Sequence, residues 1–405
     1  MDLSYRWKCS NGIMRRQRVI DSLMNGEEDW SRHLIGMSGN DIVNGRDLRG
    51  IELDGLDLSK ASLEKTHLEG ASLSRVNLTG VSLKYSFLRD ANLSNATLDR
   101  ADLTGADLQS ACLSDASMIE VTAKGTRLSY ANLLRVNLSR ACISGADLRN
   151  ASLDNAMMDE IKADFASLSH TSAVGIHASN GAFNKTSWFK SRLNDSDFSS
   201  CALVESDLSL CVCTNVKFAG SDLSRAKLRE ACLENVDFSG AVAEDTMFLS
   251  STISSANFAR ANLTHCNFNQ SLAHSPACFE SVHAPQLFAI EARMSKCSFK
   301  GAHLPESVFC EADLSECCLM DADLLQMNLQ NANVRSAHLE NACLSRAMLS
   351  GASFGDAHLD GVDMRFSPFL PSVVHGAHMD GTRLSHDARE VIESSCIYGV
   401  PVFED

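Results

Sequence analysis

Residues 101–113 read ADLTGADLQSACL, and this stretch contains the pattern that decides the fold. A large apolar residue occupies every fifth position, Ala stands two positions before it, and Asp is the commonest residue between them. We call the large residue of each repeat the centre and the residue two places before it the small position. The spacing extends from Leu48 to Phe288, then resumes one residue out of phase at Met294 and continues to Leu384.

A five-residue period fits neither the 3.6-residue turn of an α-helix nor the two-residue alternation of a strand. It requires a backbone that turns a corner every five residues, so that two side chains point inward and three point outward. The centre and the small residue must then share a narrow interior. The sequence therefore predicts a solenoid of very short strands joined by turns.

Identical residues also recur at a spacing of 20, which indicates that four repeats make one coil. Two series are aromatic and one is formed by histidine: Phe198, Phe218, Phe238 and Phe258; Phe248, Phe268 and Phe288; and His338, His358 and His378.

Runs such as ADLTGADLQSACL and ANFARANLTHCNF resemble the pentapeptide-repeat family, whose consensus is A(D/N)Lxx. The resemblance covers most of the chain. It implies an all-β solenoid, namely a right-handed quadrilateral β-helix of about 17 coils with short helical caps at both ends. It implies no catalytic activity and no cofactor.

We expect four segments along the chain. Residues 1–43 form an N-terminal helical cap, residues 44–288 and 294–385 form the β-helix in its two phases, and residues 386–405 form a C-terminal helical cap and tail. Within residues 270–293 the pattern weakens and two prolines occur, which indicates a projecting loop, a kink or a single-residue bulge. The weak centres of this stretch are Ala273, Cys278 and His283.

The composition indicates the cellular environment of the protein and the kind of partner that it binds. The net charge is −15, and the 15 cysteines lack the spacing of a disulfide framework, which favours a reduced cytoplasm. No apolar run reaches the about 18 residues of a membrane span, and we expect no signal peptide. Export into a host cell by an uncleaved signal stays open. The acidic balance argues against direct binding of nucleic acid and favours a protein partner with a basic surface.

The acidic residues concentrate in the second half. Residues 1–200 carry 23 basic and 25 acidic side chains, whereas residues 201–405 carry 13 basic and 26 acidic ones. Four acids take the same place in four successive repeats, so we expect them to encircle one coil, and two more lie beside them. The predicted partner-binding residues are Glu306, Glu311, Glu316 and Asp321, together with Asp313 and Asp323. A solvated surface that keeps a repetitive protein soluble is the other interpretation.

The column His338, His358 and His378 would place imidazoles ~4.8 Å apart on adjacent coils. Such a ladder is a candidate metal site or pH-sensitive element. We interpret it as a tolerant polar face and predict no metal site, because no carboxylate partner for the ring nitrogens is evident. Most cysteines replace the small residue or the Asp/Asn of a repeat, so we interpret them as core filling and not as ligands.

The sequence is compatible with two kinds of function. The first is a non-catalytic protein–protein interaction scaffold, of which a bacterial effector acting on host proteins is a subtype. The second is a DNA mimic that binds DNA gyrase or topoisomerase, as the resemblance to quinolone-resistance members of the family implies. An enzyme is not predicted, since no catalytic motif appears. The apolar tail around residues 397–403 predicts either packing on the last coil or a homodimer contact.

Overall fold

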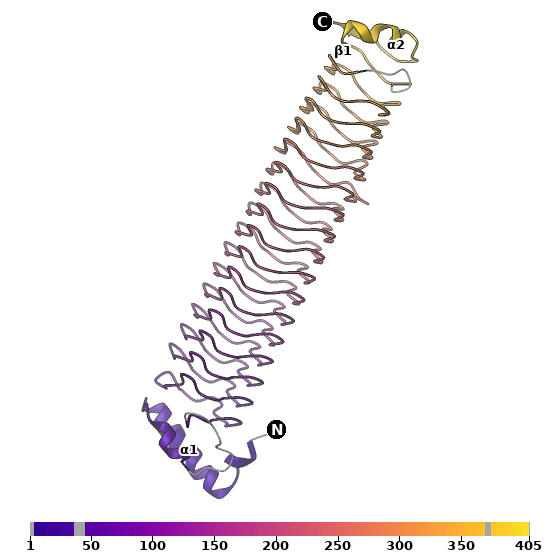
Figure 1. The fold of residues 1–405 in the computed structure, drawn as a ribbon. Coiled ribbons are helices and arrows are strands. Elements are labelled where there is room, and N and C mark those ends of the chain that lie inside the picture. The colour runs from indigo at the N-terminus through magenta and orange to yellow at the C-terminus, as the bar shows by residue number, and fades with distance from the viewer. Residues whose placement is uncertain (1–3, 36–44, 369–373, 405) are drawn as a thin grey trace. The chain divides into compact units, whose positions relative to one another are not determined.

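The structure is a computed structural model that describes residues 4–35, 45–368 and 374–404. The chain divides into two compact units, which we call unit 1 (residues 1–202) and unit 2 (residues 203–405). Figure 1 shows stacked coils in both units. In unit 1, parallel bridges join residues 20 apart, from Asp47–His67 to Ala182–Ala202. Because 20 residues are four repeats, the four-repeat coil is confirmed.

Each repeat bends because its backbone closes a tight turn. In one representative repeat, the amide of Ala106 donates to the carbonyl of Leu103 at 2.9 Å, and Gly105 takes a positive φ of 66°. A type II turn places its third residue in this region of φ. We call this the corner position. Its own amide donates to the next coil, from Gly105 to the carbonyl of Lys124 at 3.0 Å, so the turn and the stack support each other.

The residue between the small position and the centre forms the bridges, and we call it the bridge position. Asp and Asn are favoured there because their side-chain oxygen accepts a hydrogen bond from the amide two residues later. Asp102 accepts from Thr104 at 3.0 Å, and Asp107 accepts from Gln109 at 3.1 Å. The consensus A(D/N)L is thus explained by a small inward residue, a turn-stabilising acceptor and a large inward residue.

The core contains the centres and the small residues. Leu103, Leu108 and Leu324 are at most 1% exposed, as the five-residue period predicts. In unit 2, phenylalanines stack along the interior: the rings of Phe238 and Phe258 lie 4.8 Å apart and within 5° of parallel. The coils that carry these rings therefore bury aromatic surface against their neighbours.

The register change lies earlier than the sequence interpretation placed it. Bridges of unit 2 span 21 residues from Asn257–Cys278 to Leu272–Arg293 and return to 20 at Cys278–Ser298. A single extra residue therefore enters between Leu272 and Cys278, and the ladder continues past it. Of the three alternatives for this segment, the single-residue insertion is the one observed.

The assignment of Phe288 as a centre was therefore wrong, and so were those of Cys278 and His283. Phe288 is 39% exposed at a bridge position, and Phe279, 1% exposed, is the true centre. The sequence was misleading because the next two true centres, Ala284 and Ala289, are small, whereas an aromatic residue falls on the outward-facing position.

The N-terminal segment contains the 3-10 helices η1 (Ser4–Trp7) and η2 (Trp30–Leu34) and the helix α1 (Ser10–Met24). It lies against the first coils. The indole of Trp7 donates to the carbonyl of Arg49 and that of Trp30 to the carbonyl of Ser62, both at 2.9 Å. Both indoles are buried. Of the predicted 1–43 segment, residues 1–3 and 36–43 lie outside the described residues.

The C-terminal segment contains β1 (Arg383–Leu384), η4 (His386–Ala388), α2 (Arg389–Glu393) and β2 (Val402–Phe403). β1 and β2 pair in parallel, with Arg383 opposite Val402. The expected centre Phe369 lies outside the described residues. Among the helices of the described chain, none has both the length and the apolar surface to cross a membrane.

Candidate functional site

The four acids predicted to encircle one coil occupy its four corner positions. Each has the positive φ of a corner, between 57° and 58°, and each is exposed. We call them the acidic corners: Glu306, Glu311, Glu316 and Asp321. Because a corner side chain projects away from the filled interior, all four carboxylates face the surroundings of unit 2.

The acidic corners have few cationic neighbours. Lys296 on the preceding coil lies 3.5 Å from Glu316. Glu306 instead accepts a hydrogen bond from the amide of Gln286 at 2.8 Å, and within the described residues Glu311 has no ion pair. The corners of the following coil are all uncharged: Gln326, Asn331, Ser336 and Asn341. Apart from the pair of Glu316 with Lys296, the carboxylates therefore combine into a negative surface.

Asp313 and Asp323 take a different place, at bridge positions on the flat sides between corners. They are ten residues apart, half a coil, so the structure places them on opposite sides. Asp313 is half-buried and accepts hydrogen bonds from the Ser315 amide at 3.1 Å and from Asn333 at 2.9 Å. Asp323 lies 2.8 Å from a ring nitrogen of His303. The six predicted residues surround the coil and do not share one flat surface.

The histidine column is continuous in the structure. The rings of His338 and His358 stack 4.6 Å apart, those of His358 and His378 stack 4.8 Å apart, and Tyr398 follows at 4.9 Å. Parallel bridges connect these residues in the same order. The predicted spacing of adjacent coils is therefore observed at this column.

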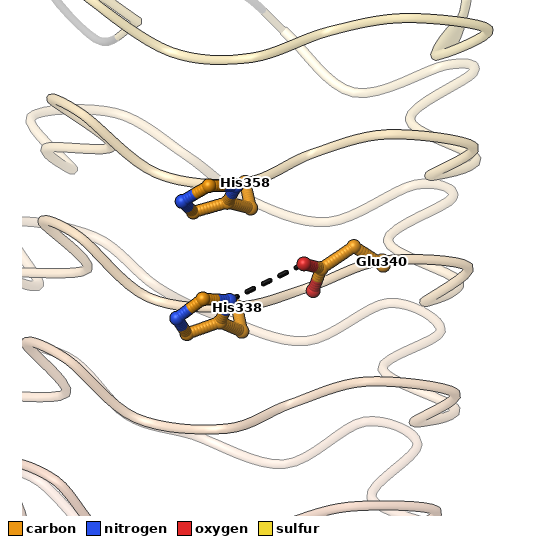
Figure 2. A group of neighbouring side chains, drawn as sticks. All are labelled: His338, Glu340 and His358. Carbon is orange, nitrogen blue, oxygen red and sulfur yellow. Dashed lines mark hydrogen bonds and ion pairs between the residues drawn. The ribbon is translucent and has the colours of Figure 1, made fainter.

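A carboxylate that the sequence interpretation missed completes the site. Figure 2 shows Glu340 beside the two stacked rings, with its Oε1 3.2 Å from Nδ1 of His338. One ligand atom from each of His338, Glu340 and His358 lies within 4.8 Å of the other two. The signal was in the sequence as His-Leu-Glu at residues 338–340, because two residues along the chain bring the acid beside the ring.

The cysteines behave as core residues. Cys201, Cys266 and Cys297 are at most 1% exposed at small positions, and burial raises the pKa of Cys201 to about 12 and of Cys297 to about 11. The thiol of Cys201 donates to the Ala178 carbonyl of the preceding coil. Hydrogen bonding to Cys211 and burial also raise the pKa of Cys213, and both cysteines lie in the closed interior, at most 1% exposed.

Coils of four five-residue repeats, joined by parallel bridges around a filled interior, define a β-solenoid protein. Two models of pentapeptide repeats match more than half of the sequence. The chain belongs to the pentapeptide-repeat family. The model described as a pentapeptide repeat region matches residues 292–369. The model described as pentapeptide repeats (8 copies) matches residues 47–80, 86–122, 116–155, 191–229, 206–242 and 231–270.

Solved pentapeptide-repeat structures are also similar. HetL, involved in heterocyst differentiation regulation in the cyanobacterium Nostoc sp. strain PCC 7120, is 24% identical, with 52% of this chain and 88% of HetL covered at a TM-score of 0.26. QnrB1, a plasmid-mediated fluoroquinolone resistance protein, is 14% identical. The match covers 55% of this chain and 95% of QnrB1, at a TM-score of 0.26. Rfr23 from the cyanobacterium Cyanothece is 22% identical. The match covers 31% of this chain and 82% of Rfr23, at a TM-score of 0.19. Among curated proteins, none matches this chain in sequence.

Proposed function

We propose that the protein is a non-catalytic interaction scaffold whose acidic corners bind a protein partner with a basic surface. The observation that carries the proposal is the set of four exposed carboxylates on one coil, with Lys296 as their single ion-pair partner in the described residues. Uncompensated charge of one sign steers and orients an oppositely charged partner.

The side between Glu306 and Glu311 is the part of this surface that best suits a partner. At its middle, Val308 bridges to Phe288, whose side chain is 39% exposed. The two corners of the preceding coil that flank Phe288 are Gln286, which is uncharged, and a further acid, Glu291. An apolar centre with a charged rim is the usual anatomy of a protein interface, and a buried aromatic residue often dominates its binding energy. We therefore place the contact on this side.

The test is affinity capture from the native organism with quantitative mass spectrometry. The test variant reverses Glu306, Glu311 and Glu316 to Lys, and the control variant reverses three corner acids elsewhere, Asp90, Glu160 and Glu230. We expect proteins retained by the wild type and the control to be lost from the test variant, and to be released by salt. Equal retention by all three proteins would remove the acidic corners from the proposal.

The second candidate function is DNA mimicry toward DNA gyrase or topoisomerase. It is favoured by the acidic excess of residues 201–405, with 26 acidic against 13 basic side chains. The acidic corners, however, encircle a coil, whereas the two phosphate backbones of a duplex run lengthwise. A supercoiling assay separates the functions, because a mimic inhibits gyrase or protects it from a quinolone, and a scaffold for another partner has no effect at micromolar concentration.

The proposal also includes the end caps, the number of coils and their handedness. We infer that residues 1–43 and 386–405 cap the repeats and that the repeats between them, segments 44–288 and 294–385, form about 17 right-handed coils. The buried indoles of Trp7 and Trp30 against the first coils support the N-terminal cap. At the other end Val400 is 73% exposed, which supports a homodimer contact through the tail.

A further inference from the structure

We propose that His338, Glu340 and His358 bind a divalent transition metal ion of the zinc type. Two imidazoles and one carboxylate form the donor set of many three-ligand zinc sites, which leave one coordination position open to water. The same donors also suit Co²⁺ and Ni²⁺ and do not suit Ca²⁺ or Mg²⁺, which prefer oxygen ligands. The site is distinct from the acidic corners and does not depend on the proposed docking function.

The distances are close to those of a metal site. Oε1 of Glu340 and Nδ1 of His338 lie 3.2 Å apart, and two ligand atoms of a tetrahedral zinc ion lie about 3.4 Å apart. The ring of His358 lies one coil away, with its centroid 4.6 Å from that of His338. His338 is exposed and His358 is half-buried, and one ligand atom of each of the three residues lies within 4.8 Å of the other two.

The second oxygen of Glu340 is an independent observation. Oε2 is buried and has no hydrogen-bond partner in the described residues. A buried acceptor without a partner is destabilising by about 1–3 kcal/mol, more for a charged group, so such atoms in folded proteins usually meet a ligand, an ion or a water. A cation bound by both oxygens of this carboxylate would satisfy it.

The neighbouring coils show why the site forms at Glu340 and not elsewhere in the column. His358 and His378 are also followed two residues later by an acid, Asp360 and Asp380. Each of these shorter side chains is engaged by backbone: Asp360 accepts from the amide of Asp380 at 2.8 Å, and Asp380 accepts from the amide of Val400 at 3.3 Å. Glu340 is longer, and its carboxylate reaches the ring.

Unit 1 contains a natural comparison. Nδ1 of His67 lies 3.0 Å from Oε1 of Glu69, and Oε2 of Glu69 is also buried without a partner. The ring stacked on His67 belongs to Phe87, at 4.4 Å and 12° from parallel. This arrangement reproduces the candidate site with one imidazole replaced by a phenyl ring. It has two donors in place of three, so we expect no tight binding there.

The experiment loads metal-free full-length protein with Co²⁺ and Zn²⁺. Wild type, His358→Phe and Glu340→Gln are compared by equilibrium dialysis with elemental analysis and by the visible spectrum of the Co²⁺ complex. We expect the wild type to bind one ion, and each variant to lose affinity by about 100-fold, because a ligand is removed. His358→Phe copies the packing of His67 on Phe87, so it should keep the wild-type circular dichroism and melting temperature.

The 15 cysteines are the main alternative source of metal binding. A thiolate ligand gives Co²⁺ an intense near-ultraviolet charge-transfer band, and an imidazole and carboxylate site does not, so the spectrum distinguishes the two. Such a band, or equal affinity in the wild type and His358→Phe, would overturn the proposal, as would the absence of Co²⁺ uptake by the wild type at millimolar metal.

The reverse substitution gives a second, positive test. Phe87→His supplies the missing imidazole next to His67 and Glu69 in unit 1. We expect the bound Co²⁺ to rise from one to two ions per chain, and to return to one in the double variant that also carries His358→Phe. A stoichiometry that stays at one in Phe87→His would show that this geometry is insufficient to bind the ion.

Discussion

Unit 1 and the coil of unit 2 that carries the acidic corners use one repeat rule but treat their corner charges differently. In unit 1, acids and bases at corners pair across adjacent coils: Asp115 lies 2.6 Å from Arg135, and Glu120 lies between Arg100 and Arg140, at 3.0 and 3.3 Å. In unit 2, the acidic corners face uncharged corners on the following coil. The five-residue period fixes where a corner side chain points but leaves its identity free, so a neutral or a charged surface can be built on the same core.

The cores of the two units differ as well. The early coils of unit 1 are filled by leucine and alanine, whereas unit 2 stacks phenylalanines from coil to coil and accommodates one inserted residue. The rings of Phe258 and Phe279 remain 4.8 Å apart across the insertion. The insertion thus changes the register of the sequence and leaves the stacking of the interior unchanged.

The largest expected effect tests this register. Phe279→Ala removes a ring that is 1% exposed and stacked on both sides, at 4.8 Å on Phe258 and 4.7 Å on Phe299. We expect a loss of about 4 kcal/mol in the free energy of unfolding, from lost burial and the cavity left behind. Phe288→Ala is the matched control, and because that ring is 39% exposed we expect a loss below about 1 kcal/mol.

Chemical denaturation followed by circular dichroism measures both variants. If Phe288→Ala proves the more destabilising of the two, the register described between Leu272 and Cys278 is wrong, and Phe288 is a centre as its position in the sequence first indicated.

The sequence predicted those features of the fold that the interior constrains. Inward positions such as Leu103 and Leu324 must be large and apolar because no alternative fills the coil, so the period and the four-repeat coil were evident. The register at residues 273–289 was not, because Ala284 and Ala289 give a weak inward signal and Phe288 gives a strong outward one. Packing between coils, which determines the register there, is not visible in a local pattern.

The candidate sites were predicted less completely for a related reason. Regular spacing placed the acidic corners correctly, but whether they are neutralised depends on residues 20 positions away. Asp313 looked equivalent to them by charge, yet it accepts backbone and side-chain hydrogen bonds within the fold. Glu340 was missed because outward positions follow no rule of residue type, and its role depends on a ring one coil away.

The second prediction compares the ion pairs nearest the two chain ends. Asp47 accepts two hydrogen bonds of 2.7 Å from Arg6, and both side chains are at most 1% exposed. Asp47→Asn leaves the buried Arg6 cation without a counter-ion, so we expect the segment containing α1 to lose about 3 kcal/mol of docking stability. At the other end Asp363 pairs with Arg365 and Arg383, which are 28% and 44% exposed, so Asp363→Asn should have less effect.

Native-state hydrogen exchange of the α1 amides measures the docking stability of the N-terminal segment. For Asp363→Asn, the same experiment measures the exchange of amides in the last coils. Equal protection of α1 in wild type and Asp47→Asn would contradict the role given to this pair.

The third prediction is the pH dependence of the same contact. Burial alone would raise the pKa of Asp47, but hydrogen bonds from Arg6 and Arg49 outweigh it and lower the pKa from 3.8 to about 2. A carboxylate with a depressed folded-state pKa stabilises the fold above its unfolded pKa and loses this contribution as the pH falls. We therefore expect about 2 kcal/mol of α1 docking stability to be lost between pH 4 and pH 2. The difference between wild type and Asp47→Asn isolates this group, and a constant difference over that interval would contradict it.

The smallest expected effect transplants the corner chemistry of unit 1 into unit 2. Gln326 is the corner next to Glu306 on the following coil, so Gln326→Arg recreates the arrangement of Asp115 and Arg135. Exposed ion pairs contribute little to stability, and we expect a stabilisation of at most about 1 kcal/mol that disappears in molar salt.

The effect of Gln326→Arg on partner binding should be larger, because the new cation neutralises part of the proposed contact between Glu306 and Glu311. Gln326→Glu is the control, and it should leave partner capture intact or strengthen it. If Gln326→Arg and Gln326→Glu retain the same proteins equally, charge at this side does not select the partner, and the contrast between the two units has no role in recognition.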